Sequence, residues 1–200
     1  LLRDWSSDVC SSDLGTLHRG KTLVVGGDVR LSTPVLKKYL IQGLMETGIH
    51  VLDIGCVTTP MFYFALDAEF FHAAAPQGGI MVTASHNPAR YNGFKMMFGN
   101  APVTAEEIKK VEELVHLKNF CTGIGSYGTR RIDGEYAVFI EKHCRKGRLK
   151  IVLDCCDGAA SKIVPDIMEK MGYEVIPLYC GSDGDFPNRN PNPAEYECLA

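Results

Sequence analysis

The stretch from Gly78 to Phe98 constrains the fold more than any other part of this 200-residue chain. Its apolar run from Ile80 to Thr83 contains β-branched residues and predicts a buried strand. The run stops at Ser85-His86-Asn87-Pro88, where Asn-Pro favours a turn and the proline ring restricts the residue before it. The pattern therefore predicts a strand that delivers a serine hydroxyl to a stiff loop. That loop lies at the carboxyl end of the strand, where open α/β sheets bind their ligands.

The residues around Ser85 favour phosphate chemistry over hydrolysis. Serine is a weak nucleophile unless another group activates it. In an extended segment the side chains of Ser85 and His86 would point apart, which argues against a simple Ser-His pair. Arg90 and Lys95 bring two cations, which suit a transferring phosphoryl group. The alternative is a structural turn in which Ser85 only satisfies backbone groups.

Two strings carry a family resemblance. T-A-S-H-N-P (residues 83–88) and Y-N-G-F-K (91–95) resemble the phosphoserine loop of the phosphohexomutase superfamily, in its phosphoglucomutase/phosphomannomutase branch. The resemblance implies that Ser85 is the catalytic serine that carries the phosphoryl group. It also implies that His86 and Asn87 flank this serine, and that His86 orders the loop or moves a proton. Lys95 would help with phosphate contacts or proton transfer.

An earlier loop resembles the same family. Asp28-x-Arg30-x-Ser32 follows a predicted strand and is similar to a loop that the family places close to the phosphoserine, which implies that Arg30 and Ser32 bind phosphate or substrate. The family residue at the position of Gly27 is usually basic, so this position departs from the pattern. The alternative is an Asp-Arg pair that only fixes a turn.

The residue pattern divides the chain into three parts. Residues 1–20 lack helical or strand periodicity, and we predict a non-native terminus whose first 14 or so residues are foreign. Residues 21–147 alternate strands and helices and are assigned to the first family domain, an α/β domain with three α/β/α layers around a mixed sheet. Residues 148–200 restart with a strand, a helix and a strand, which predicts the first β-α-β unit of a second, similar domain.

Composition limits the possible partners and the cell compartment. A net charge of −3 offers no broad basic face, so neither nucleic acid nor an anionic membrane is an expected partner. No apolar run approaches the roughly 20 residues that a membrane-spanning helix needs. The eight cysteines show no metal-binding spacing, which favours reduced thiols and a cytoplasmic protein.

For a full-length relative, the resemblance implies four domains around one cleft. Such an enzyme interconverts hexose 1-phosphate and hexose 6-phosphate through a hexose 1,6-bisphosphate. Mg²⁺ would bind a phosphoryl oxygen on Ser85 together with aspartates of a D-G-D-x-D-R motif that this sequence does not contain. We therefore expect the 200-residue chain alone to be inactive, because losing one such electrostatic group can cost about 10³ in rate.

The sequence leaves several alternatives open. A serine hydrolase could use Ser85 if a distant histidine and an acid lay near the loop. A non-catalytic fragment could bind a sugar phosphate or a protein partner. The preference between glucose and mannose, and the oligomeric state, are undetermined.

Overall fold

A computed structural model describes residues 20–67, 75–99, 101–117 and 121–195. The predicted foreign segment, residues 1–14, lies outside these ranges. The elements in chain order are β1 (Thr22–Gly27), α2 (Thr33–Glu46), β2 (His50–Cys56), α3 (Thr59–Phe64), β3 (Gly78–Val82), β4 (Phe94–Phe98), β5 (Ala101–Pro102), α5 (Ala105–Leu117), β6 (Tyr127–Thr129), α6 (Asp133–His143), β7 (Lys150–Asp154), the 3₁₀ helix η1 (Ala159–Lys162), α7 (Val164–Lys170) and β8 (Glu174–Leu178).

The larger sheet is mixed, as predicted. Its strand order is β5-β4-β3-β1-β2-β6. The pairs β3-β1, β1-β2 and β2-β6 are parallel, whereas β3-β4 and β4-β5 are antiparallel. Parallel strands place their carboxyl ends at one edge, so the loops after β1, β2 and β3 gather there.

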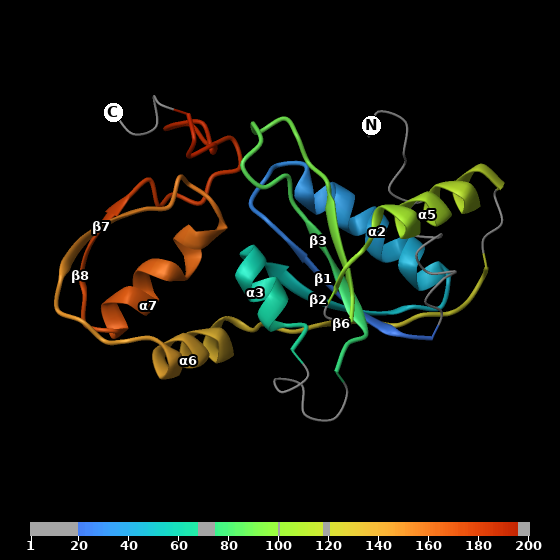
Figure 1. Cartoon of the computed structure of the whole chain (residues 1–200), viewed down its shortest axis with the longest axis horizontal. Coiled ribbons are helices and arrows are strands. Elements are labelled where there is room, and N and C mark those ends of the chain that lie inside the picture. The colour runs from blue at the N-terminus through green and yellow to red at the C-terminus, as the bar shows by residue number, and fades with distance from the viewer. Residues whose placement is uncertain (1–19, 68–74, 100, 118–120, 196–200) are drawn as a thin grey trace.

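The central strand β1 shows why the domain has three layers. Leu23 and Val25 are fully buried in one core, together with residues of α2 and α5. Val24, between them, is buried in the other core, with residues of α3 and α6. Successive side chains of a strand point to opposite faces, so a strand apolar at every position needs helices on both sides. Figure 1 shows α2 and α5 on one side of the sheet and α3 on the other.

The second unit packs against the first through a shared core. Strands β7 and β8 form a two-stranded parallel sheet in register from Lys150↔Glu174 to Asp154↔Leu178. Ile163 and Ile167 are buried in the same cluster as Phe62 of α3 and Ile132, which precedes α6. Burying an aliphatic side chain of this size contributes about 1.5–3 kcal/mol, so the two units stabilise one another.

Sequence-based boundaries hold within a few residues, with one exception at β6. The sequence Thr104-Ala105-Glu106-Glu107 predicts a capping box at the start of α5. The structure confirms it, because the Thr104 backbone N–H donates to Glu107 Oε2 at 2.8 Å and the Glu107 N–H donates to Thr104 Oγ1 at 3.3 Å. Thr33 and Thr59, each followed by a proline, are expected from the sequence as N-caps, but the N-caps are Ser32 and Thr58, one residue earlier. Residues 119–129 are Gly-rich and polar, which predicts a loop. This prediction is wrong at its end, where β6 pairs with β2.

Within the described ranges, no helix is both long enough and apolar enough to cross a membrane.

Candidate active site

Ser85 stands at the carboxyl end of β3 in a left-handed backbone conformation. Its φ angle is +57°, which is uncommon for a residue other than glycine. The strand pairing continues past Val82, because the Thr83 N–H donates to the Gly93 carbonyl at 2.9 Å. The Ser85 N–H donates to Thr83 Oγ1 at 3.0 Å, and the serine side chain is exposed. Strained backbone conformations of this kind cluster at functional sites.

The left-handed turn brings the side chains of Ser85 and His86 together. Ser85 Oγ lies 3.4 Å from His86 Nδ1. The expectation that these side chains point apart is therefore wrong, because it assumed an extended backbone at Ser85. Within the described part of the chain, His86 has no carboxylate partner that could orient its ring, as a hydrolytic triad requires.

A buried arginine fixes the main chain of the serine loop. Arg30 is fully buried, and its guanidinium donates all five of its N–H groups. Nε donates to Asp28 Oδ2 at 3.1 Å. The other four N–H groups donate to loop carbonyls, at 2.8 Å to Pro88, 3.0 Å to Tyr91, 2.9 Å to Ser85 and 2.7 Å to Asn87.

These contacts bear on the role expected of Arg30. No N–H group of its guanidinium is left for a phosphate oxygen in this arrangement. The Asp-Arg pair of the alternative interpretation is present, and it does more than fix its own turn, since it also binds the loop after β3. The contacts favour Arg30 as a residue that positions Ser85.

Asp28 completes the support of the loop. Its carboxylate accepts four hydrogen bonds, from the Arg30 N–H at 3.1 Å, Arg30 Nε at 3.1 Å, Thr33 Oγ1 at 2.8 Å and Thr83 Oγ1 at 2.7 Å. Thr83 in turn accepts from the Ser85 N–H. A hydrogen-bonded chain thus runs from the loop after β1 to the backbone of the candidate catalytic serine.

The other predicted site residues occupy different parts of this edge. Asn87 donates Nδ2 to the Ala84 carbonyl at 3.0 Å, so its amide helps to shape the turn. Ser32 accepts from Asn92 Nδ2 at 2.9 Å. Lys95 is exposed on β4 directly across from Met81, so its side chain leaves the sheet on the same face as Met81.

A pocket of about 430 Å³ opens beside Ser85, between the two units. Both Ser85 and His86 line it from the first unit, together with Met81. The second unit contributes the segment after β7 and the segment before the carboxyl end, through Cys155, Cys156, Gly158, Ala159, Ala160, Phe186, Pro191 and Pro193. Figure 1 shows the second of these segments approaching the loop that follows β3. Sequence reasoning did not assign this wall of the pocket, although its Gly and Pro residues indicated loops.

Cys155 lines that wall, and Asp157 lies in the same loop just behind it. Burial, together with the neighbouring Cys180 thiol, raises the pKa of Cys155 from the ordinary 9.0 to about 12, so this thiol stays protonated at neutral pH. Asp157 is buried and accepts from the Gly181 N–H at 3.0 Å and Asn188 Nδ2 at 2.7 Å. Asp157 therefore holds the segment that carries Phe186.

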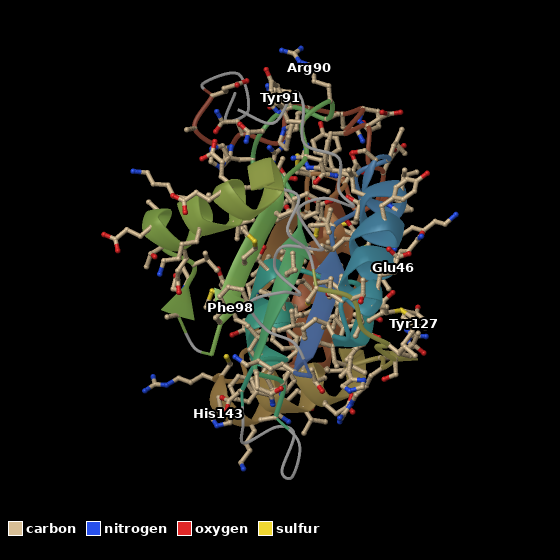
Figure 2. All side chains as sticks on the ribbon, turned by 90° about the vertical axis from the view of Figure 1, so that its right-hand side faces the viewer. Glu46, Arg90, Tyr91, Phe98, Tyr127 and His143 are labelled. Carbon is tan, nitrogen blue, oxygen red and sulfur yellow. The ribbon has the colours of Figure 1, made fainter. Side chains whose placement is uncertain are left out.

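Arg90 and Tyr91 extend the serine loop away from this wall. The guanidinium of Arg90 lies over the Tyr91 ring at 5.0 Å from its centroid. Figure 2 shows both side chains at one tip of the molecule, at the opposite end from His143. Arg90, one of the two cations near Ser85 in sequence, thus points outward from the loop.

The described residues do not build a magnesium site by themselves. Within the described ranges, no group of three or more His, Cys, Asp or Glu side chains could hold a metal ion. Asp28 is already saturated with hydrogen bonds. Ser85 could offer one oxygen through a phosphoryl group, so the present residues supply part of a coordination shell at most.

A second pocket, of about 560 Å³, lies beside α2 and away from Ser85. Its polar groups already satisfy one another, because Lys37 pairs with Asp53 at 2.5 Å and Tyr127 donates to Asp53 Oδ2 at 3.3 Å. Burial, with the charge of Asp53, raises the pKa of Tyr127. This pocket is larger, but it holds no exposed nucleophile of the kind that Ser85 provides.

Together these features define an α/β/α protein that presents a rigidly held serine at a cleft between two α/β units. Family comparison agrees with this class. Residues 9–120 match "Phosphoglucomutase/phosphomannomutase, alpha/beta/alpha domain I" and residues 133–200 match domain II of the same family. The chain belongs to the phosphoglucomutase/phosphomannomutase family.

Individual relatives give the same result. A phosphomannomutase/phosphoglucomutase of Pseudomonas aeruginosa is 39% identical over 186 residues, which cover 92% of this chain and 39% of that protein. A phosphoglucomutase of Neisseria gonorrhoeae is 37% identical over 180 residues, or 88% of this chain and 38% of that protein. The crystal structure of a family protein from Burkholderia thailandensis matches with a TM-score of 0.87 and 32% identity, covering 100% of this chain and 46% of that one.

The chain therefore spans well under half the length of these curated relatives.

Proposed function

We propose that the complete protein is a phosphohexomutase that interconverts hexose 1-phosphate and hexose 6-phosphate. The observation that carries the proposal is the exposed Ser85 hydroxyl, which a left-handed backbone and the Arg30 contacts present to the cleft between the two units. A serine fixed in this way can accept and return a phosphoryl group without reorganising its loop. The relatives named phosphoglucomutase and phosphomannomutase support the substrate class.

In the proposed reaction, phospho-Ser85 donates its phosphoryl group to a hexose phosphate. The resulting hexose 1,6-bisphosphate reverses its orientation in the cleft and returns its other phosphoryl group to Ser85. His86, whose Nδ1 is 3.4 Å from Ser85 Oγ, is the proposed group that takes or returns the serine proton. Lys95, on the face of Met81, would neutralise phosphate charge, and Asn87 and Ser32 would shape the phosphate-binding edge.

Mg²⁺ belongs to the proposal as the ion that neutralises charge on the transferring phosphoryl group. Among the residues described, only a phosphoryl oxygen on Ser85 would bind it, so its other ligands are not in the described ranges. The six described cysteines are free thiols, which supports a reducing compartment and hence the cytoplasm.

The test is a coupled assay of the complete protein with glucose 1-phosphate and with mannose 1-phosphate. We expect turnover of at least one of them, and its loss in Ser85→Ala with an unchanged circular dichroism spectrum. Ser126→Ala is a matched control, because it removes an exposed serine hydroxyl that does not line the cleft. Turnover retained by Ser85→Ala would refute the assignment of the nucleophile.

A further inference from the structure

The guanidinium of Arg30 is contacted from both units. The edges of the planar group face Asp28 and the serine-loop carbonyls, all within the first unit. Its face is covered by the ring of Phe186 from the second unit, with 5.2 Å between Arg30 Cζ and the ring centroid. Hydrogen bonds fix the group in its plane, and the ring restricts movement out of that plane.

The backbone near Phe186 is built for this close approach. Gly184 is buried against the loop that contains Arg30, and a Cβ atom there would lie 2.3 Å from the Val29 carbonyl oxygen and 2.9 Å from Arg30 Cα. Any larger residue would push the two segments apart. Phe186 itself has a φ angle of +52°, an uncommon conformation that the Phe186 N–H to Asp183 carbonyl bond of 3.1 Å helps to hold.

Ser85 and Phe186, which both have left-handed backbone conformations, thus contact the same arginine, Arg30. Ser85 accepts from Arg30 Nη2, and Phe186 covers the face of the same guanidinium. We propose that Phe186 is a positioning residue, through which the second unit keeps Arg30 aligned and the serine loop ordered. Only the catalytic consequence rests on the proposed function; the effect on the loop stands without it.

The structural arm of the test is hydrogen exchange of the 200-residue chain. The Ser85, Asn87 and Tyr91 N–H groups are hydrogen-bonded within the loop, so their exchange reports its order. Phe186→Leu keeps an apolar side chain but loses the aromatic face, and we expect loop exchange to accelerate roughly two- to thirty-fold. Phe186→Tyr keeps the face and should exchange like the parent chain.

Two further variants separate this role from general packing. Gly184→Ala displaces the Phe186 segment without altering its ring, and should loosen the same loop amides. Phe139→Leu, on α6, removes an aromatic ring that packs on Phe64 instead of Arg30, and should leave the loop unchanged. Equal protection in Phe186→Leu and the parent chain would overturn the proposal, as would equal loosening by Phe186→Tyr and Phe186→Leu. If the β1 amides of Phe186→Leu also exchange faster, this variant has unfolded as a whole. The comparison of Gly184→Ala and Phe186→Tyr with the parent chain then decides whether Phe186 positions the loop.

The catalytic arm uses the complete protein. Phe186→Leu should lower kcat by about the same two- to thirty-fold factor as that expected for loop exchange, while KM for the hexose phosphate changes less. Phe186→Tyr should have the kcat of the parent protein. A rise in KM alone would show that Phe186 contacts substrate and does not position the loop. An inactive parent protein would contradict the proposed function, while the exchange result would still decide the role of Phe186.

Discussion

Arg30 Nη2 lies 2.9 Å from the carbonyl oxygen of Ser85, so a buried guanidinium on one loop fixes the backbone of the residue that we assign as the phosphoryl carrier. The same nitrogen binds the Asn87 carbonyl at 2.7 Å. A loop held by hydrogen bonds to its carbonyls keeps its side chains free to face the cleft. The Asp28-x-Arg30-x-Ser32 loop therefore positions Ser85 through hydrogen bonds to the main chain of the serine loop, and not through the serine side chain.

The first prediction concerns Arg30→Lys. Lysine has three N–H donors and no planar fork, so at least two of the five interactions of Arg30 are lost. Each buried carbonyl left without a donor costs about 1–3 kcal/mol, and we expect a total loss of about 2–5 kcal/mol in the free energy of unfolding. Urea unfolding measures it. Arg90→Lys, at an exposed position of the serine loop, is the matched control and should change stability by less than about 0.5 kcal/mol.

The second prediction concerns the support of the second unit. Asp157→Ala removes the acceptor of the Gly181 N–H and of Asn188 Nδ2. We expect a destabilisation of about 2–4 kcal/mol, because two hydrogen bonds to a buried carboxyl group are lost. Asp185→Ala, an exposed acid on the same segment, serves as the control in thermal unfolding. Equal melting temperatures for the two variants would show that Asp157 does not organise this segment.

The third prediction uses the reactivity of Cys155. An acid whose pKa rises on folding binds its proton more tightly in the folded state. At pH 9 an ordinary thiol is half ionised, whereas Cys155, with a pKa of about 12, is ionised in about one molecule in a thousand. Only the thiolate reacts, so iodoacetamide should label the exposed Cys144 well before Cys155 between pH 7 and 9. Peptide mass spectrometry follows the labelling of each cysteine. Comparable labelling rates for Cys144 and Cys155 would contradict the burial of Cys155.

The same shift has a consequence for stability. Cys155 contributes its stabilisation in full below pH 9, and the contribution is lost as pH rises from 9 towards 12, because the unfolded chain ionises first. Unfolding of Cys155→Ser should therefore depend less on pH than unfolding of the parent chain in this window. Parallel pH profiles for the two proteins would exclude the effect.

The fourth prediction concerns the 200-residue chain itself. We expect no turnover of glucose 1-phosphate, with or without Mg²⁺, because the described residues contain no group able to hold the metal. Phosphoryl transfer depends largely on such electrostatic groups. The complete protein is the positive control in the same coupled assay. Measurable turnover by the chain alone would show that the cleft beside Ser85 suffices.

Local sequence patterns were sufficient for most of the fold. The residues after the turn signal Tyr91-Asn92-Gly93 predict a short strand from Phe94 to Phe98, and β4 has these bounds. The capping box at Thr104 sets the start of α5. Strand β6 was missed because Tyr127–Thr129 lies in a Gly-rich, polar segment. Its strand conformation comes from pairing with β2, a non-local contact that periodicity does not report.

The site was predictable as a set of residues but not as an arrangement. T-A-S-H-N-P located Ser85 and His86. The left-handed φ angle of Ser85, which brings the two side chains together, is not indicated by Ser85 or by its sequence neighbours. The D-x-R-x-S loop was placed correctly near the serine. The contact of Arg30 with Phe186 joins residues 156 positions apart (186 − 30), and nothing local to either residue indicates it.

The most direct test of the account is to map phosphate in the complete protein after incubation with glucose 1,6-bisphosphate and Mg²⁺. Peptide mass spectrometry should find one phosphoryl group, on Ser85, which glucose 6-phosphate then removes. Ser85→Ala should carry none, while Ser126→Ala, an exposed serine outside the cleft, should be phosphorylated like the parent protein. Phosphate on another residue, or an unmodified Ser85 in a protein that interconverts hexose phosphates, would contradict the central claim that Ser85 carries the phosphoryl group.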